Sequence, residues 1–131
     1  MNKELKPPIR VAHVITRMIL GGAQENTLLT VEGLAKQPDK FQVTLLTGPT
    51  VGREGELIER LEKRHLEWHL IPDLIREISP WHDGLALLQL LSYFKKNQPH
   101  IVHTHSSKAG ILGRIAAHWS KVPVIIHTIH G

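Results

Sequence analysis

The sequence contains no cysteine, few aromatic residues and no long hydrophobic run, and each absence excludes a class of protein. Without cysteine among its 131 residues, the chain forms neither a disulfide nor a thiolate metal site, which fits a reducing compartment. Aromatic residues make up only 5% of the chain, so Leu, Ile, Val and Ala must supply most of the core. There is no run of about 18 apolar residues, and the opening segment MNKELKPP lacks the apolar region of a signal peptide. The sequence therefore indicates neither a transmembrane span nor a secretory signal.

Positively charged residues are present, but they are spread along the chain. The formal net charge at pH 7 is +4, and 41% hydrophobic with 21% charged residues is typical of a soluble globular domain. A basic protein of this kind suits phosphate groups or an anionic membrane surface. No array of basic and aromatic residues of the RNA-binding kind occurs. We therefore expect no nucleic-acid partner.

Short β-branched segments alternate with segments that have a helical apolar pattern. Residues 1–8 are polar and end in Pro-Pro, and we expect them to be disordered. The domain is therefore expected to span residues 9–131. Strands are expected at residues 9–16, 41–47, 66–71, 100–104 and 122–129. Helices are expected at residues 23–37, 54–63, 81–97 and 108–120. The apolar faces of these helices are expected to include Leu29, Leu88 and Ile111.

This alternation predicts a Rossmann-like α/β fold with three layers, α/β/α. Several strands are apolar on both faces, as in a mainly parallel sheet that helices cover on both sides. Right-handed crossovers and a reversal after the third strand give the strand order 3-2-1-4-5. The first and fourth strands then lie side by side, and open α/β sheets bind ligands at the carboxyl ends of such strands.

The fifth strand, residues 122–129, has no helix after it. A doubly wound sheet left in this way exposes an apolar strip, which monomeric proteins avoid. We therefore expect the chain to be part of a longer protein, and expect the strip to allow self-association when the chain is alone.

The stretch HIVHTHSSKAG, residues 100–110, carries the polar groups expected at the switch point. His103 and His105 alternate with Thr104, so both should face the same side of the sheet near the strand end. Ser106 and Ser107 stand where the next helix begins, and a helix N-cap needs only one of them. Lys108 in the first turn opposes the helix dipole, which favours a bound anion beside it.

Gly21 and Gly22 lie at the junction of the first strand and first helix. Two residues without Cβ atoms let the backbone approach a phosphate or a sugar at a helix N-terminus. They also suit a simple turn with positive φ, and the dinucleotide motif G-x-G-x-x-G is absent. Both interpretations stay open on the residues alone.

Ten histidines occur, and four of them, His103, His105, His127 and His130, fall near the ends of the last two strands. Four imidazoles can bind zinc, but no carboxylate or cysteine accompanies them. We expect a hydrogen-bonding pocket for a polar ligand, and no metal.

The helix expected at residues 81–97 carries a mixture of aromatic and basic side chains, namely Trp81, Tyr93, Phe94, Lys95 and Lys96. Such a stripe docks some proteins on a membrane surface. More often it is the sheet-facing side of a covering helix, and we favour that interpretation.

Three segments together resemble a known family: VAHVITRMILGGAQENTLLTVEGLAKQ, FQVTLLTGP and PHIVHTHSSKAGILGRIAAHWSKVPVIIHTIHG. They are similar to the N-terminal domain of family 4 glycosyltransferases, which have the GT-B fold. The resemblance covers nearly the whole chain after residue 8. One departure is His100, which stands where the family commonly has Asp.

The resemblance implies one half of a GT-B fold, in which a second Rossmann-like domain faces this one across a cleft. It implies that His130 and His105 lie near the reacting sugar. It implies that the donor is bound by Gly21, Gly22, Arg17, Ser106, Ser107 and Lys108. The C-terminal domain with its nucleotide-sugar-binding glutamates is absent, so the chain alone is expected to be inactive.

The implied activity is transfer of a sugar, with retention, from a nucleotide-diphosphate sugar to a sugar or lipid-linked acceptor. It implies no metal and no tightly bound cofactor, a role in cell-surface polysaccharide or glycoconjugate synthesis, and a cytoplasmic location with peripheral contact at the membrane inner face. Two other interpretations remain open: one half of a UDP-sugar 2-epimerase, and a stand-alone flavodoxin-like ligand-binding module.

Overall fold

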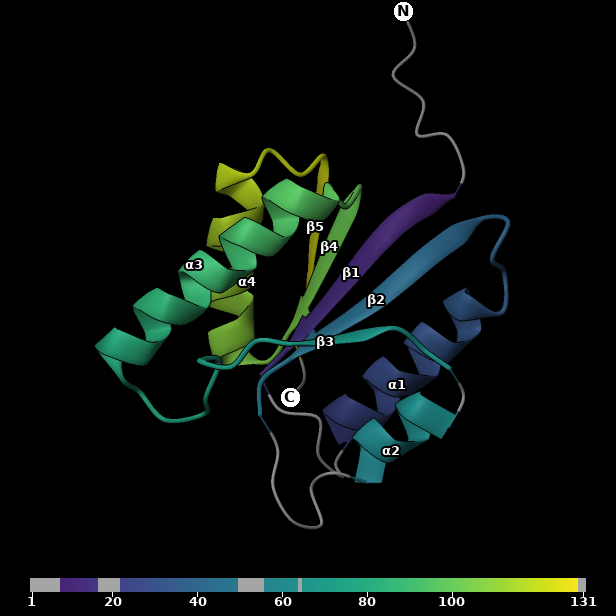
Figure 1. The fold of residues 1–131 in the computed structure, drawn as a ribbon, viewed down its shortest axis with the longest axis horizontal. Coiled ribbons are helices and arrows are strands. Elements are labelled where there is room, and N and C mark those ends of the chain that lie inside the picture. Colours follow the sequence, from purple (N-terminus) through teal and green to yellow (C-terminus); the bar gives the residue numbers. More distant parts are fainter. Residues whose placement is uncertain (1–7, 17–21, 50–55, 64, 130–131) are drawn as a thin grey trace, which may run out of the picture.

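A five-stranded, all-parallel sheet forms the centre of the molecule, with helices on both faces (Figure 1). The computed structural model describes residues 8–16, 22–49, 56–63 and 65–129. In chain order the elements are β1 (Ile9–Ile15), α1 (Gly22–Ala35), β2 (Phe41–Thr47), α2 (Glu56–Lys63), β3 (Trp68–Leu70), α3 (Pro80–Asn97), β4 (Ile101–His105), α4 (Ser107–Trp119) and β5 (Val124–Thr128). The strand order β3-β2-β1-β4-β5 confirms both the predicted fold class and the predicted reversal after the third strand.

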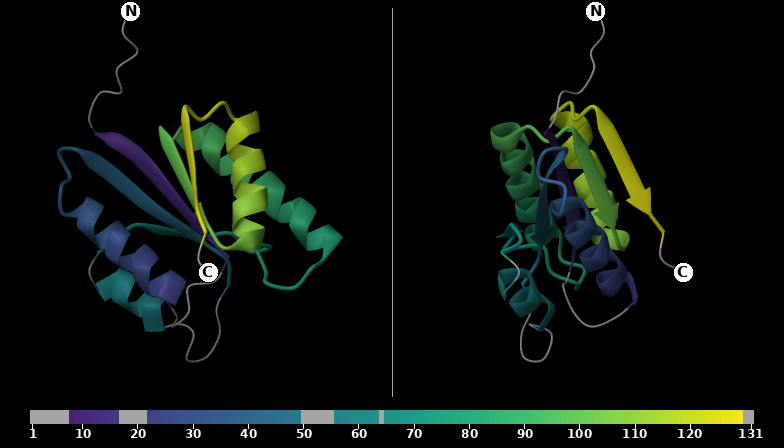
Figure 2. Two further views of the ribbon diagram at one scale, coloured as in Figure 1. Left: turned by 180° about the vertical axis from the view of Figure 1, so that it is seen from behind. Right: turned by 90° about the vertical axis from the view of Figure 1, so that its right-hand side faces the viewer.

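The helices form one layer on each face of the sheet (Figures 1 and 2). Apolar side chains fill the space between the sheet and each layer. On one face, Val14 and Val102 of the sheet pack with Leu90 and Phe94 of α3 and with small residues of α4. On the other face, the buried residues are Val11, Ile15, Leu28, Val31, Val43, Leu45 and Leu61. Successive residues of β1 thus belong to opposite cores, as the alternation of a strand requires.

Two strands begin later than the sequence predicts, because the first residue predicted for each closes the helix before it. The Leu66 N–H donates to the Leu61 carbonyl and the Val122 N–H donates to the Ala117 carbonyl, so both residues close a helix. The strands then begin only at Trp68 and Val124.

Three leucine and isoleucine positions predicted to face inward are exposed. Leu29, Leu88 and Ile111 are 59%, 61% and 54% exposed. In α4 the buried positions are instead small: Ala109, Gly110, Gly113, Ala116 and Ala117. A helix that packs through small residues lies close to the sheet and turns its larger side chains outward.

The glycines of α4 are needed for this close packing. A Cβ added to Gly113 would lie 2.6 Å from Thr104 Cγ2, and one added to Gly110 would lie 2.4 Å from the His127 ring. The absence of a Cβ at Gly110 and Gly113 therefore allows α4 to lie close to the sheet.

The fifth strand leaves apolar side chains in solvent, as expected. Val124, Ile125 and Ile126 are 38%, 36% and 42% exposed. On the side of the sheet that carries α1 and α2, these helices lie over β1, β2 and β3 and leave β5 at the open edge (Figure 2). None of the helices in the described part of the chain is long and apolar enough to cross a membrane.

Candidate functional site

The carboxyl ends of β1 and β4 meet at the predicted switch point. The two strands pair in parallel, with His13 opposite His103 and Val14 opposite Thr104. Thr16 follows β1 and Ser106 follows β4, so the polar residues after both strands lie at one edge of the sheet. Rossmann-like sheets bind their ligands at this position.

Thr16 and Ser106 join the end of β1 to the start of α4 through a small hydrogen-bond network. Their hydroxyl oxygens lie 2.9 Å apart, and the Ala109 N–H donates to Thr16 Oγ1 over 3.2 Å. Ser106 stands at the N-cap position, yet its own side chain makes no capping bond. The residue that satisfies a free N–H of the first turn of α4 is therefore Thr16, which follows β1.

Ser106 has an unusual backbone conformation. Its φ is 67° and its ψ is 166°, a combination that is almost restricted to glycine. Such strain costs of order 1–3 kcal/mol and concentrates at functional sites. Together with the network to Thr16, it indicates that the turn between β4 and α4 is held in a specific shape.

Three histidines lie together beside this turn. His13 Nδ1 is 3.0 Å from His105 Nε2, and the ring of His103 is stacked on that of His105 with centroids 4.3 Å apart. His103 Nε2 lies 2.5 Å from Thr128 Oγ1 of β5. We call His13, His103 and His105 the histidine cluster; its members lie on β1 and β4, and Thr128 of β5 contacts it.

His13 is the most deeply buried member of the histidine cluster. It is 1% exposed, and its Nε2 atom has no hydrogen-bond partner in the part of the chain that the structure describes. Burial, and secondarily the nearby His103, lower the pKa of His13 from 6.5 to about 3. The ring is therefore neutral near pH 7 and carries a single proton on one of its two nitrogens.

The histidine cluster is also where the described residues offer three close nitrogen ligands for a metal. One nitrogen from each ring lies within 4.8 Å of the others. Two imidazole ligands of one tetrahedral zinc ion are about 3.4 Å apart, since each Zn–N distance is about 2 Å. The rings would have to move to share an ion, and two of them are already hydrogen-bonded to each other. We interpret the cluster as a hydrogen-bonded group, and the absence of a metal requirement remains a prediction.

The structure brings some of the predicted site residues together. His105 and Ser106 lie at the switch point, and Ser107 is exposed in the first turn of α4. Gly22 is the first residue of α1. Arg17, Gly21 and His130 fall outside the described residues.

Two of the predicted residues, Lys108 and His127, contact other parts of the structure instead of the histidine cluster. Lys108 Nζ is 2.7 Å from Asp83 Oδ1 of α3, and it also donates to the Glu77 carbonyl oxygen. His127 lies on the opposite face of the sheet from the histidine cluster, where its Nδ1 is 2.8 Å from Thr104 Oγ1. The four-histidine group considered from sequence is therefore not formed with His127, and His13 is the third ring of the group that does form.

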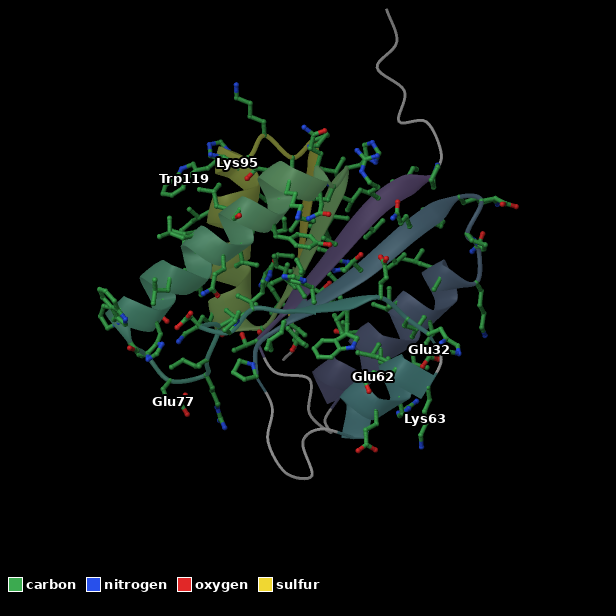
Figure 3. All side chains as sticks on the ribbon, in the orientation of Figure 1. Glu32, Glu62, Lys63, Glu77, Lys95 and Trp119 are labelled. Carbon is green, nitrogen blue, oxygen red and sulfur yellow. The ribbon has the colours of Figure 1, made fainter. Side chains whose placement is uncertain are left out.

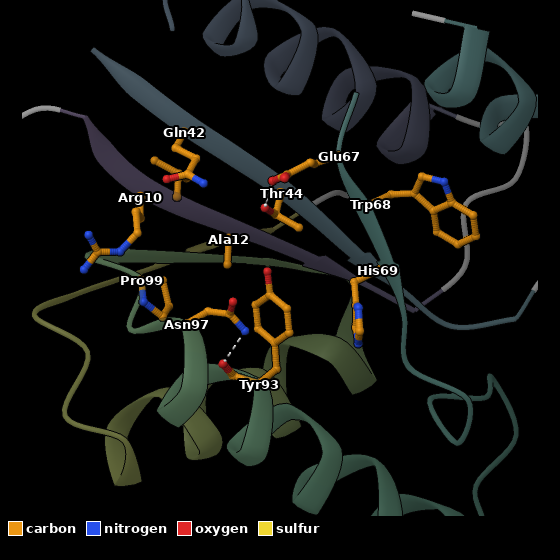
Figure 4. A pocket seen from close by; sticks show the side chains of 11 residues that line it. Arg10, Ala12, Gln42, Thr44, Glu67, Trp68, His69, Tyr93, Asn97 and Pro99 are labelled. Atoms are coloured by element: carbon orange, nitrogen blue, oxygen red, sulfur yellow. Dashed lines mark hydrogen bonds between the residues drawn. The ribbon is translucent and has the colours of Figure 1, made fainter. Parts of the chain in front are cut away.

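A separate polar cavity of about 240 Å³ lies at the opposite end of the sheet (Figure 4). Arg10 and Gln42, near the starts of β1 and β2, line it together with Tyr93 of α3. Burial raises the pKa of Tyr93 above its usual value of 10.0. This cavity is distant from the strand ends where Ser106 and His105 lie, so we do not assign it to the candidate site.

Comparison with known proteins decides the family. A family model described as "Glycosyl transferase 4-like domain" matches residues 21–131. The chain belongs to this family. The resemblance found in the three sequence segments is thereby confirmed.

The similarity to one curated relative extends over nearly the whole chain. The chain is 37% identical over 129 residues to "UDP-Gal:alpha-D-GlcNAc-diphosphoundecaprenol alpha-1,3-galactosyltransferase" of Escherichia coli. The match covers 98% of the chain and 32% of that relative, so the chain spans about a third of its length.

Solved structures share the fold of the domain. A glycosyltransferase from Rickettsia africae matches 95% of the chain with 30% of its own, at 20% identity and a TM-score of 0.71. A UDP-GlcNAc 2-epimerase from Neisseria meningitidis matches 88% of the chain with 31% of its own, at 13% identity and a TM-score of 0.64. At these identities the likeness concerns the fold, which glycosyltransferases and epimerases have in common.

Sequence reasoning missed two residues of the candidate site, His13 and Thr16. Both lie in or just after an apolar strand, where a single polar residue resembles an ordinary core position. The predicted strand order places β1 beside β4, but only the register of these two strands puts His13 opposite His103.

Proposed function

We propose that this domain is the acceptor-side half of a retaining glycosyltransferase that takes its sugar from a nucleotide-diphosphate sugar. The observation that carries the proposal is the family match over residues 21–131, supported by 37% identity to a galactosyltransferase. The function of the full-length protein is proposed to be cell-surface polysaccharide or glycoconjugate synthesis. By analogy with the named relative, we propose a UDP-sugar donor and a GlcNAc-diphosphate lipid acceptor.

The geometry of the switch point suits this chemistry. Negative charge builds on the departing diphosphate during sugar transfer, and backbone N–H groups at a helix start stabilise such charge. We propose that Gly21, Gly22, Arg17, Ser106 and Ser107 contact the donor, with His105 and His130 near the transferred sugar. Lys108 joins them only after its ammonium leaves Asp83, because the two are paired in this structure.

The test is a transfer assay on the full-length protein that contains this domain, with UDP-galactose and a synthetic GlcNAc-diphosphate lipid. We expect His105→Ala and His130→Ala to lower kcat about 100-fold or more. The matched control is His118→Ala, an exposed histidine of α4, which should retain wild-type activity. We also expect transfer to persist in excess EDTA.

Two outcomes would overturn the proposal. Full activity of both site variants would remove the assigned residues from the chemistry. Interconversion of free UDP-GlcNAc and UDP-ManNAc without an acceptor would instead assign the epimerase activity.

We further propose peripheral contact with the cytoplasmic face of a membrane, through the outer face of α3 and α4. Trp81, Leu88 and Trp119 are 75%, 61% and 58% exposed there. Basic side chains accompany them at exposed positions: Lys95, Lys96, Arg114 and Lys121. Exposed apolar groups beside basic ones favour an anionic lipid surface, where a lipid-linked acceptor would be found.

A further inference from the structure

We propose that His13 is a positioning residue that holds the proton of His105 on Nδ1. The observation behind it is the contact of 3.0 Å between His13 Nδ1 and His105 Nε2, both buried. The inference deepens the proposed function, because it concerns the protonation of a residue assigned to the transfer site. It is independent of which sugar is transferred.

Only one nitrogen of each neutral imidazole carries hydrogen, so the contact requires one donor and one acceptor. A proton on His13 Nε2 would be a buried donor with no partner, since that atom is sealed from solvent and makes no hydrogen bond to the described residues. A bare Nε2 would be an unsatisfied acceptor, and either unsatisfied group costs about 1–3 kcal/mol, but orphaned buried N–H groups are rarer in proteins than under-satisfied acceptors. The proton of His13 therefore resides on Nδ1, where it is donated to His105.

The consequence for His105 follows from the same rule. Its Nε2 atom accepts the hydrogen bond, so the single proton of the neutral His105 ring is on Nδ1. This makes Nδ1 a hydrogen-bond donor, and donors of this kind suit the oxygen atoms of a sugar or a phosphate. The tautomer of the site residue is thus set by a residue of β1 that need not contact substrate.

His13 is well placed to act in this way because it cannot easily turn. It lies on β1 between Leu45 of β2 and His103 of β4, in register with both. Its ring is 4.8 Å from that of His103 and 5.3 Å from that of His105, measured between centroids. A different orientation of the ring would break this packing as well as the hydrogen bond.

The direct test is the tautomeric state of the histidines, measured by 15N NMR on the chain labelled with 15N-histidine at pH 7.5. We expect His13 and His105 to be protonated on Nδ1. His100 is the internal control with the opposite tautomer, because its Nδ1 accepts the Arg10 N–H over 2.9 Å and its proton must be on Nε2. A proton on Nε2 of either His13 or His105 would overturn the proposal, and this measurement requires no variant and no activity.

Two variants then test the effect on catalysis in the full-length protein. His13→Asn places an amide N–H near the position of Nδ1, whereas His13→Gln places it near the position of Nε2. We expect the Asn variant to keep the His105 tautomer and kcat within about threefold of wild type. We expect the Gln variant to lose that tautomer and to lower kcat about tenfold or more.

Equal losses of kcat in the Asn and Gln variants, with matching losses in Tm, would show a purely structural role and overturn the proposal. Failure of the proposed function looks different. In that case the wild-type protein shows the expected tautomers but transfers no sugar.

Discussion

At the scale of single residues, the backbone of Ser106 gives the sharpest prediction. Its φ of 67° favours glycine, while its hydroxyl contacts Thr16. Ser106→Ala loses the hydroxyl and keeps the strain, but Ser106→Gly loses the hydroxyl and relieves the strain. We expect the Gly variant to be more stable than the Ala variant by about 1 kcal/mol, after the greater chain entropy of glycine is subtracted. Urea denaturation of both variants measures the difference.

The neighbouring serine provides the control. Ser107 is the first residue of α4 and is exposed, so glycine there weakens a helix. The order of stability should reverse at this position, with Ser107→Ala above Ser107→Gly. The same order at both positions would show that the conformation of Ser106 is not strained.

At the scale of elements, close packing of α4 depends on Gly113. An added Cβ would lie 2.6 Å from Thr104 Cγ2, and Thr104 is fully buried. We expect Gly113→Ala to reduce the free energy of unfolding by about 1–3 kcal/mol. Gly84→Ala on α3 is the matched control, because its Cβ meets nothing within 4 Å. That variant should gain about 0.5–1 kcal/mol, and equal gains in both variants would contradict the close packing of α4.

The same element shows how far the sequence could predict the fold. The helical period placed α4 correctly, since apolar residues recur through residues 108–120. It placed Ile111 on the wrong face, because period alone does not say whether large or small residues face the sheet. In α4 the small residues are buried, and this choice depends on the distance between helix and sheet, which only the folded structure fixes.

At the scale of the whole molecule, chain topology could be predicted and side-chain pairing could not. The rules for parallel sheets gave the strand order and the switch point of β1 and β4. The contact between His13 and His105 joins residues 92 positions apart and depends on the register of two strands. No local pattern encodes that register, so one half of the candidate site was found and the other half was missed.

The last prediction concerns the outer surface that α3 and α4 form together. Trp81, Leu88 and Lys95 recur every seven residues along α3, and Figure 3 shows Lys95 at the same end of this layer as Trp119 of α4. If this surface contacts lipid, the full-length protein should sediment with phosphatidylglycerol vesicles at low salt. Binding should fall with phosphatidylcholine vesicles or at high salt, because the basic side chains attract anionic headgroups.

Two substitutions distinguish lipid contact through this surface from non-specific binding of exposed apolar side chains to vesicles. Trp119→Ser removes a large exposed apolar group from the proposed contact, and we expect it to weaken vesicle binding about tenfold. Leu29→Ser removes a similarly exposed group, at 59%, from α1 on the opposite layer, and should leave vesicle binding unchanged. Equal effects of the two changes would mean that the lipid contact is not made by α3 and α4. Sugar transfer to a soluble, short-chain acceptor should be unaffected by Trp119→Ser, because that side chain is in the last turn of α4, away from the histidine cluster.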